Sequence, residues 1–232
     1  MVAGRAALAG RVSGFVRCPA REHNVENQMT IRLHRGDLPD LSAYKESVAI
    51  DTETLGLNPS RDRLCVVQLS PGDGTADVVQ IPAGPVNAPN IAKLLADPAR
   101  LKIFHFARFD LAVLYKNLGV MAQPFYCTKI VSGLVRTYPD RHSLKELARE
   151  LLGMDMSKQQ QSSDWGADKL SEAQVAYAAS DVLYLHQIKR KLDEMLAREG
   201  REALAEACFR FLPARVALAL GGCAEEDIFS HS

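Results

Sequence analysis

The stretch SVAIDTETLGL at residues 47–57 joins a short apolar run to two carboxylates, Asp51 and Glu53, and then breaks at Gly56. In a strand, residues i and i+2 point to the same face, so Asp51 and Glu53 are expected to project together. Two like charges this close repel unless a cation lies between them. A hard divalent ion such as Mg²⁺ or Mn²⁺ is the expected occupant. A strand end with two solvated acids is the competing interpretation, and this motif alone favours it.

Composition narrows the classes of protein to which the chain can belong. The 232 residues carry 28 basic and 28 acidic side chains, so the formal net charge is zero. A protein that coats long nucleic acid by bulk charge is therefore not expected. The five cysteines are scattered without a C-x-x-C pair, so we expect neither a zinc site nor a disulfide framework, and a reducing, cytoplasmic setting. No apolar run has transmembrane length, and we expect no membrane partner.

The first 28 residues differ in composition from the rest of the chain. They carry four arginines before the first acid, Glu22, and have no sustained apolar stretch. A secretory signal is not expected from this pattern. We interpret residues 1–28 as a disordered or leader tail, with Met29 as an alternative initiator, and residues 29–232 as a single domain.

The pattern that follows predicts an α/β fold. Three strand-like runs, separated by Gly and Pro clusters, predict an antiparallel meander after an opening strand at 29–34. Helix and strand patterns then alternate, which implies crossover connections and a partly parallel sheet. The meander is expected at 47–50, 64–70 and 76–81; the alternating segments are a helix at 90–96, a strand at 101–106, a helix at 110–118, a strand at 125–128 and a helix at 129–135.

The C-terminal part is predicted to be helical. Ser143 has Glu146 three residues on, a capping-box pattern, and we expect a helix from there to 152 that ends at Gly153. The polar segment 158–165 is expected to be a loop over the site. Further helices are expected at 171–198 and 201–210, and Pro213 is expected to begin a last one.

Two further groups of polar residues follow in the chain. Asp110 comes at the expected start of a helix, where an acid is also favoured simply by the helix dipole. Tyr177 and Asp181 are four residues apart and therefore share one helix face. Taken alone, that pair is better explained as a core tyrosine beside a solvated aspartate. Asp-x-Glu and Tyr-x-x-x-Asp each occur once, however, and Asp110 lies between them.

Taken together, these motifs resemble the DEDD superfamily of 3′–5′ exonucleases, in its tyrosine-bearing, ribonuclease D-like branch. That family is also resembled by the surrounding sequence segments, which are VAIDTETLGL, LCVVQLS, HSLKELARELLG, SDW and YAASDVLYL. The resemblance implies a ribonuclease H-like fold, with a mixed sheet flanked by helices. A narrower resemblance, to the nanoRNase C subgroup, rests on DTETLGLNPSRDRLCVVQLSPGDGTADVVQI and the terminal EEDIFSHS. It implies cleavage of very short RNAs, especially dinucleotides, to mononucleotides in the last step of RNA decay.

The resemblance also implies the catalytic residues. Asp51 would bridge two divalent ions, Mg²⁺ or Mn²⁺. Glu53 and Asp181 would complete the site of the ion that activates water, and Asp110 would hold the second ion. Tyr177 would orient the attacking water by a hydrogen bond, because a free tyrosine, with a pKa near ~10, is a poor general base.

Substrate-binding residues are implied less specifically. Leu57, after the Glu-x-x-Gly turn, would wedge between the bases; an ordinary loop leucine is the alternative. Cationic or hydroxyl donors would bind the 5′ phosphate, and the candidates are Arg61, Arg63, His105, Arg108, Lys145 and Lys158. Family members form rings of eight, so a homo-octamer is expected. The alternative functions are a general 3′–5′ exonuclease on longer RNA or DNA, and a catalytically silent nucleic-acid-binding module.

Overall fold

The computed structural model describes residues 30–137, 141–157, 159–160 and 162–223, together with Met1 and Ile228. In these residues six strands form one sheet, in the order β1-β4-β3-β2-β5-β6. The tail predicted at 1–28 lies outside the described residues, apart from Met1. The strands are β1 (Thr30–Arg35), β2 (Ser47–Thr54), β3 (Leu64–Ser70), β4 (Thr75–Gln80), β5 (Leu101–Phe104) and β6 (Phe125–Cys127).

The sheet is mixed, as the sequence predicts. β2 pairs antiparallel with β3, and β3 pairs antiparallel with β4, which confirms the meander. β5 runs parallel to β2 and to β6, and β1 runs parallel to β4 at the other edge. β5 pairs with β2 over Ser47–Ala49, and β2 continues to Thr54 beyond this pairing. The carboxylates of β2 therefore lie past the end of the neighbouring strand.

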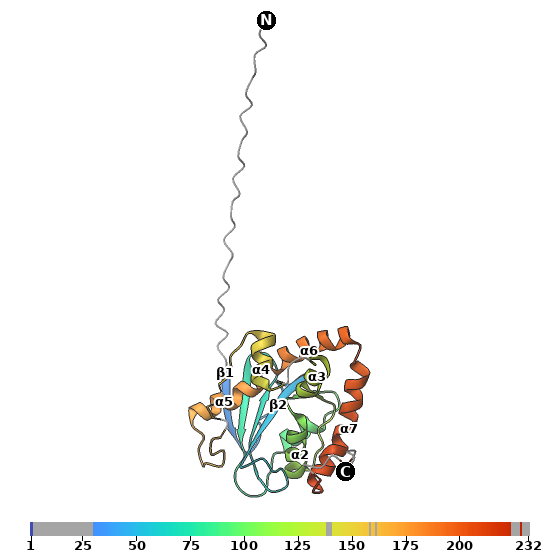
Figure 1. Cartoon of the computed structure of the whole chain (residues 1–232). Helices are drawn as coiled ribbons and strands as arrows, with labels where there is room; N and C mark the ends of the chain where they lie inside the picture. The colour runs from blue at the N-terminus through green and yellow to red at the C-terminus, as the bar shows by residue number, and fades with distance from the viewer. Residues whose placement is uncertain (2–29, 138–140, 158, 161, 224–227, 229–232) are drawn as a thin grey trace.

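Helices cover both faces of the sheet (Figure 1). Val48 and Ile50 of β2 pack in one core with α1, α2 and α7, whereas Ala49 packs in the opposite core with α3, α5 and α6. This alternation is the two-residue period of a strand. The helices are α1 (Pro89–Ala96), α2 (Ala107–Leu118), α3 (Thr128–Val135), α4 (Leu144–Leu147), the π-helix η1 (Ala148–Leu152), α5 (Glu172–Leu183), α6 (Leu185–Glu199) and α7 (Glu202–Leu220).

Local sequence explains where two helices begin and one ends. The Ser143 side chain accepts the Glu146 N–H at the start of α4, and Gly153 ends η1 with a left-handed φ of 69°. Ser171 and Gln174 form a complete capping box at the start of α5. Because side chains satisfy N–H groups that the first turn leaves unpaired, these serines define the helix boundaries.

Two predicted helix boundaries are wrong. The predicted helix 171–198 breaks at Tyr184 into α5 and α6, because α5 packs on the sheet while α6 packs on α3 and η1. Pro213 does not start a helix but lies inside α7. Leu212 and Val216, on either side of Pro213, are buried in the core, and this packing keeps the helix continuous.

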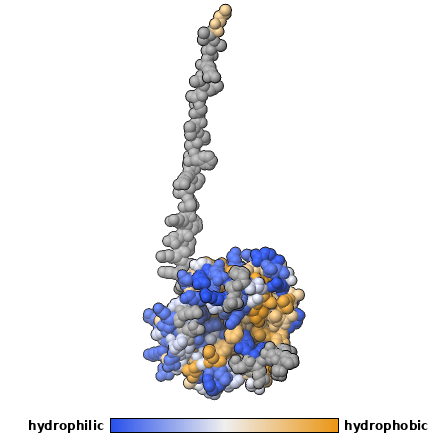
Figure 2. Space-filling model, viewed as in Figure 1, coloured by the Kyte–Doolittle hydropathy of each residue, from blue (hydrophilic) through white to orange (hydrophobic). Residues whose placement is uncertain are grey.

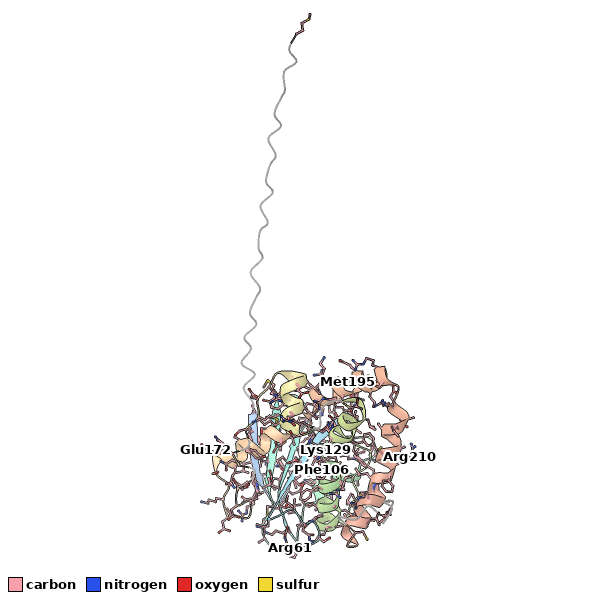
Figure 3. The ribbon with its side chains drawn as sticks, in the orientation of Figure 1. Arg61, Phe106, Lys129, Glu172, Met195 and Arg210 are labelled. Carbon is pink, nitrogen blue, oxygen red and sulfur yellow. The ribbon has the colours of Figure 1, made fainter. Side chains whose placement is uncertain are left out.

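The connection from β5 to α2 is shorter than predicted. The expected strand 101–106 ends at Phe104, and α2 begins at Ala107 rather than Asp110. Phe106, between them, has a left-handed backbone with φ 65° and ψ 44°. Figure 3 shows Phe106 and Lys129 together near the middle of this view, whereas Arg61 and Arg210 lie toward the edge of the molecule.

The surface differs between the two halves of the face shown in Figure 2. Polar side chains cover much of the half formed by α5, and apolar side chains gather on the half formed by α7. Leu204 and Phe211 of α7 are among the exposed large apolar residues. None of the helices within the described ranges is long and apolar enough to cross a membrane.

Candidate active site

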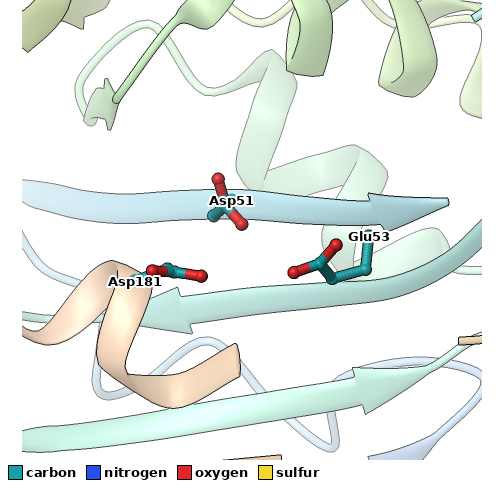
Figure 4. A group of neighbouring side chains, drawn as sticks. All are labelled: Asp51, Glu53 and Asp181. Carbon is teal, nitrogen blue, oxygen red and sulfur yellow. The ribbon is translucent and has the colours of Figure 1, made fainter. Parts of the chain in front are cut away.

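Three carboxylates meet where β2 passes α5. Asp51 and Glu53 project from the same face of β2, on which α5 packs and to which it brings Asp181 (Figure 4). One carboxylate oxygen from each of Asp51, Glu53 and Asp181 lies within 4.8 Å of the other two. We call these three residues the carboxylate triad. Oxygen ligands at this spacing suit a hard divalent cation, and their chemistry fits Mg²⁺ or Mn²⁺.

Burial raises the pKa of every member of the triad, and neighbouring carboxylates raise it further for Glu53 and Asp181. Burial raises the pKa of Asp51 above its ordinary value of 3.8. Burial, followed by the charges of Asp51 and Asp181, raises the pKa of Glu53. Burial and the charge of Asp51 raise the pKa of Asp181 in the same way. No ion pair reaches the triad within the described part of the chain. The described residues thus supply the carboxylates of a cation site without a paired counter-charge.

Asp110 approaches from the opposite side of β2. It lies in the first turn of α2, is 2% exposed and is not part of the triad. Thr52, between the two β2 carboxylates, donates from Oγ1 to Asp110 Oδ1 at 2.7 Å. Burial and the charge of Asp51 raise the pKa of Asp110. The charge of Asp51 therefore acts on Asp110, and the Thr52 hydroxyl orients the Asp110 carboxylate.

A second side chain orients Asp51. Gln68 of β3 is directly opposite Asp51 in the strand register and is fully buried. Its Nε2 donates to Asp51 Oδ2 at 3.2 Å. Hydrogen bonds of this kind fix the direction of a carboxylate toward a metal.

Tyr177 lies one helical turn before Asp181 on α5, and both side chains line the same cavity. Its ring centroid is 6.1 Å from that of Trp165, which is 3% exposed. Burial, followed by the charge of Asp181, raises the pKa of Tyr177 above its ordinary value of 10. The phenol consequently keeps its proton at neutral pH and can act as a hydrogen-bond donor.

The triad opens into a cavity of about 650 Å³. Leu57, in the loop after β2, lines this cavity and is 88% exposed. Phe106, Lys129, Ser143 and Lys145 line it as well. The cavity therefore combines a carboxylate end with apolar, hydroxyl and cationic side chains.

The predicted substrate-binding residues differ in whether they line the cavity. His105 lines the cavity, and its Nδ1 is 2.9 Å from Thr128 Oγ1. Burial, then the charge of Lys129, lowers the pKa of His105 to about 3, so its imidazole is neutral. Arg108 does not line the cavity, and its Cζ lies 5.3 Å from the centroid of the Phe106 ring.

The other cationic candidates also differ in position. Lys145 lines the cavity, whereas Arg61 pairs with Asp62 at 2.7 Å. Arg63 donates to the main-chain oxygens of Ile81 and Gly166 at 3.2 and 3.3 Å. Lys158 lies outside the described residues. Lys145 is thus the remaining lysine or arginine candidate that the structure brings to the cavity.

Sequence reasoning missed four residues of the site. Gln68 has a visible signal, because it is a polar residue within the mostly apolar strand LCVVQLS. Thr52 and Lys129 carry no distinctive local pattern. Phe106 is missed because a left-handed backbone is not expected of a residue with a bulky side chain.

The sequence of residues 38–197 matches the profile of the 3′–5′ exonuclease family. This match covers most of the chain. The chain belongs to that family. The predicted ribonuclease D-like membership and the ribonuclease H-like exonuclease fold are thereby confirmed.

Relatives within the exonuclease family include ribonuclease D and NrnC. Ribonuclease D of Granulibacter bethesdensis is 36% identical over 156 residues, which are 67% of this chain and 39% of that protein. The chain thus spans about two fifths of the length of the ribonucleases D it matches. The structure of Brucella melitensis NrnC, a nanoRNase C, shares 65% identity and a TM-score of 0.85, and the match covers 88% of this chain and 100% of NrnC. NrnC has also been solved with bound Mg²⁺ and bound to pGG.

Proposed function

We propose that this protein is a metal-dependent 3′–5′ exoribonuclease that hydrolyses very short oligoribonucleotides, preferentially dinucleotides, to 5′-mononucleotides in the last step of RNA decay. The observation that carries the proposal is the half-buried triad, with three carboxylates within 4.8 Å, at one end of a cavity of about 650 Å³. The similarity to NrnC, solved with Mg²⁺ and with pGG, supports the choice of metal and substrate.

Four acids would hold two divalent ions, Mg²⁺ or Mn²⁺: Asp51, Glu53, Asp110 and Asp181. Bound ions would lower the pKa of the attacking water and stabilise the charge that develops on the phosphate. Thr52 and Gln68 orient Asp110 and Asp51 through the hydrogen bonds at 2.7 and 3.2 Å. Tyr177 keeps its proton and positions the water by a hydrogen bond.

The size of the cavity supports the proposed preference for short substrates. Its volume of about 650 Å³ is typical of a small-ligand pocket, roughly 300–1,000 Å³. Leu57 projects into this space with 88% of its surface exposed and would wedge between two bases. Neutral His105 and the cations Lys129 and Lys145 would contact phosphate. Arg108, outside the cavity lining, would act in substrate binding only through its contact with the Phe106 ring.

The deciding experiment is a time course with end-labelled RNAs of two, three, five and seven nucleotides, in Mg²⁺ and then in Mn²⁺, with Asp51→Ala as the blank. We expect rapid loss of the dinucleotide and slow attack on the seven-nucleotide RNA. Even, stepwise shortening of every length would favour the alternative, a general 3′–5′ exonuclease. Parallel DNA oligonucleotides test single-stranded DNA as a substrate.

Two other outcomes would contradict the catalytic proposal. Equal activity in the Asp51→Ala blank would mean that the observed cleavage comes from a contaminant. Binding of dinucleotide without cleavage, in both metals, would favour a catalytically silent binding module. Asp51, Glu53, Tyr177 and Asp181 line one cavity, and buried Asp110 accepts a hydrogen bond from the lining residue Thr52. This arrangement argues against that module.

We further propose that residues 29–232 act as one exonuclease domain in a cytoplasmic homo-octamer. The apolar surface on α7, with Leu204 50% exposed and Phe211 42% exposed, supports self-association (Figure 2). Light scattering on the purified protein should give eight times the mass of the chain. A monomer at micromolar concentration would contradict the octamer without affecting the assignment of the catalytic residues.

A further inference from the structure

Phe106 has a backbone conformation that its side chain disfavours. Its φ is 65°, and among the described residues Phe106 is the one non-glycine residue with a positive φ. Glycine adopts this conformation without steric cost, whereas a residue with a Cβ atom does not. Left-handed non-glycine residues persist where the surrounding structure holds them, often at binding sites. The fold therefore keeps an aromatic residue at a position where glycine would be less strained.

The Phe106 ring is not packed into the hydrophobic core. Phe104, two residues earlier, is fully buried, whereas Phe106 is 38% exposed and lines the cavity. The Nζ of Lys129 lies 4.1 Å from the centroid of the Phe106 ring (Figure 3). Contacts between a cation and an aromatic face are attractive. Lys129 thus braces the ring, and part of the aromatic surface remains open to the cavity.

We propose that the ring of Phe106 is the stacking surface for one nucleobase of the substrate. This inference rests on the proposed function and adds a residue that contacts the substrate. Aromatic faces stack on every base, so the contribution is independent of sequence, and removing one such ring typically weakens binding roughly 5- to 150-fold. Leu57, exposed in the same cavity, offers a second apolar contact from a different loop.

The left-handed backbone allows this role to be separated from a structural one. Phe106→Gly removes the ring and also relieves the disfavoured conformation. A structural Phe106 predicts a lower melting temperature for this variant. A stacking Phe106 predicts weaker substrate binding with a melting temperature that is unchanged or higher.

The experiment measures kcat, KM and melting temperature for the wild type, Phe106→Gly, Phe106→Leu and Phe106→Trp. Tyr115→Leu is the matched control, because Tyr115 is also an aromatic residue on α2 and is 43% exposed. The substrates are a 5′-phosphorylated diribonucleotide and two analogues, each lacking one base. We expect Phe106→Gly to raise KM roughly 5- to 150-fold on the intact dinucleotide, and Phe106→Leu to raise it less.

The analogues identify the stacked base. On the analogue that lacks this base, Phe106→Gly and the wild type should have the same KM; on the other analogue the loss should persist. Phe106→Trp and Tyr115→Leu should keep KM near the wild-type value. An unchanged KM in Phe106→Gly, an equal loss on all three substrates, or a lowered melting temperature with unchanged KM would overturn the stacking role. A wild type that cleaves no dinucleotide would overturn the proposed function and this inference together.

Discussion

Two carboxylate sites on one sheet, the buried Asp77 and the half-buried triad, behave in opposite ways. At the edge formed by β1 and β4, Asp77 accepts hydrogen bonds from Arg32 Nε at 2.7 Å and from Tyr44 Oη at 2.5 Å, and His34 Nε2 lies 2.7 Å away. Burial raises the pKa of Asp77, but these hydrogen bonds outweigh burial and hold the pKa below 3.8. At the triad, burial raises the pKa of Asp51 and no cationic side chain offsets it within the described residues.

The difference separates a site that stabilises the fold from the site that we propose binds a metal ion. A buried carboxylate with charged and hydroxyl partners stabilises the native state. A cluster of buried carboxylates without a counter-charge destabilises it until a cation binds. The Asp77 site is therefore structural, whereas the described residues place no paired counter-charge at the triad.

The largest expected effect comes from Asp51→Ala. Activity should fall about 10²- to 10³-fold, the scale of removing an electrostatic partner of the transition state. The thermal stabilisation that Mn²⁺ gives the wild type, about 2.7 kcal/mol at one hundred times Kd, should disappear. Scanning calorimetry with and without Mn²⁺ measures this, and Asp77→Asn, which should keep the Mn²⁺ response, is the control. Unchanged Mn²⁺ stabilisation in Asp51→Ala would show that the triad is not the metal site.

Asp77→Asn should differ from Asp51→Ala, because it should lower the stability of the protein and leave its activity unchanged. We expect a loss of about 1–3 kcal/mol, because buried donors lose a charged acceptor. Since the pKa of Asp77 is lowered in the folded state, this stabilisation is present above the ordinary pKa near 3.8 and is lost as the pH falls through the lowered pKa.

Urea unfolding of wild type and Asp77→Asn at pH 7 and at successively lower pH measures this dependence. The difference in unfolding free energy should shrink as the pH drops below about 4, near the reference pKa of aspartate. A difference that does not vary with pH would mean that the charge of Asp77 contributes nothing.

Thr52→Val should have the smallest effect. It removes the hydroxyl that donates to Asp110 at 2.7 Å and preserves the side-chain shape. Metal affinity should fall about tenfold, as for other groups that orient a metal ligand. Titration calorimetry with Mn²⁺ measures the change, and Thr75→Val, a hydroxyl near the Asp77 site, is the matched control. Equal Mn²⁺ affinity in the two variants would show that the Thr52 hydroxyl does not contribute to metal binding.

Local pattern predicted much of the fold, and the resemblance to an exonuclease family singled out the motif residues. The alternation along β2 placed Asp51 and Glu53 on one face, and the four-residue spacing placed Tyr177 and Asp181 on another. Failures occurred where packing overrides the local signal. Tyr184 interrupts a continuous helical pattern because its two flanking helices pack on different elements, and Pro213 stays within a helix because its neighbours are buried.

By itself, the sequence determined which residue types occur, in what order, and which of them share a strand or helix face, because those relations depend on backbone periodicity. Only the tertiary structure decided that Asp181 meets Asp51, that Asp110 approaches from the other side through Thr52, and that Phe106 turns toward the cavity. These relations join segments far apart in the chain, and long-range packing of helices against the sheet sets them.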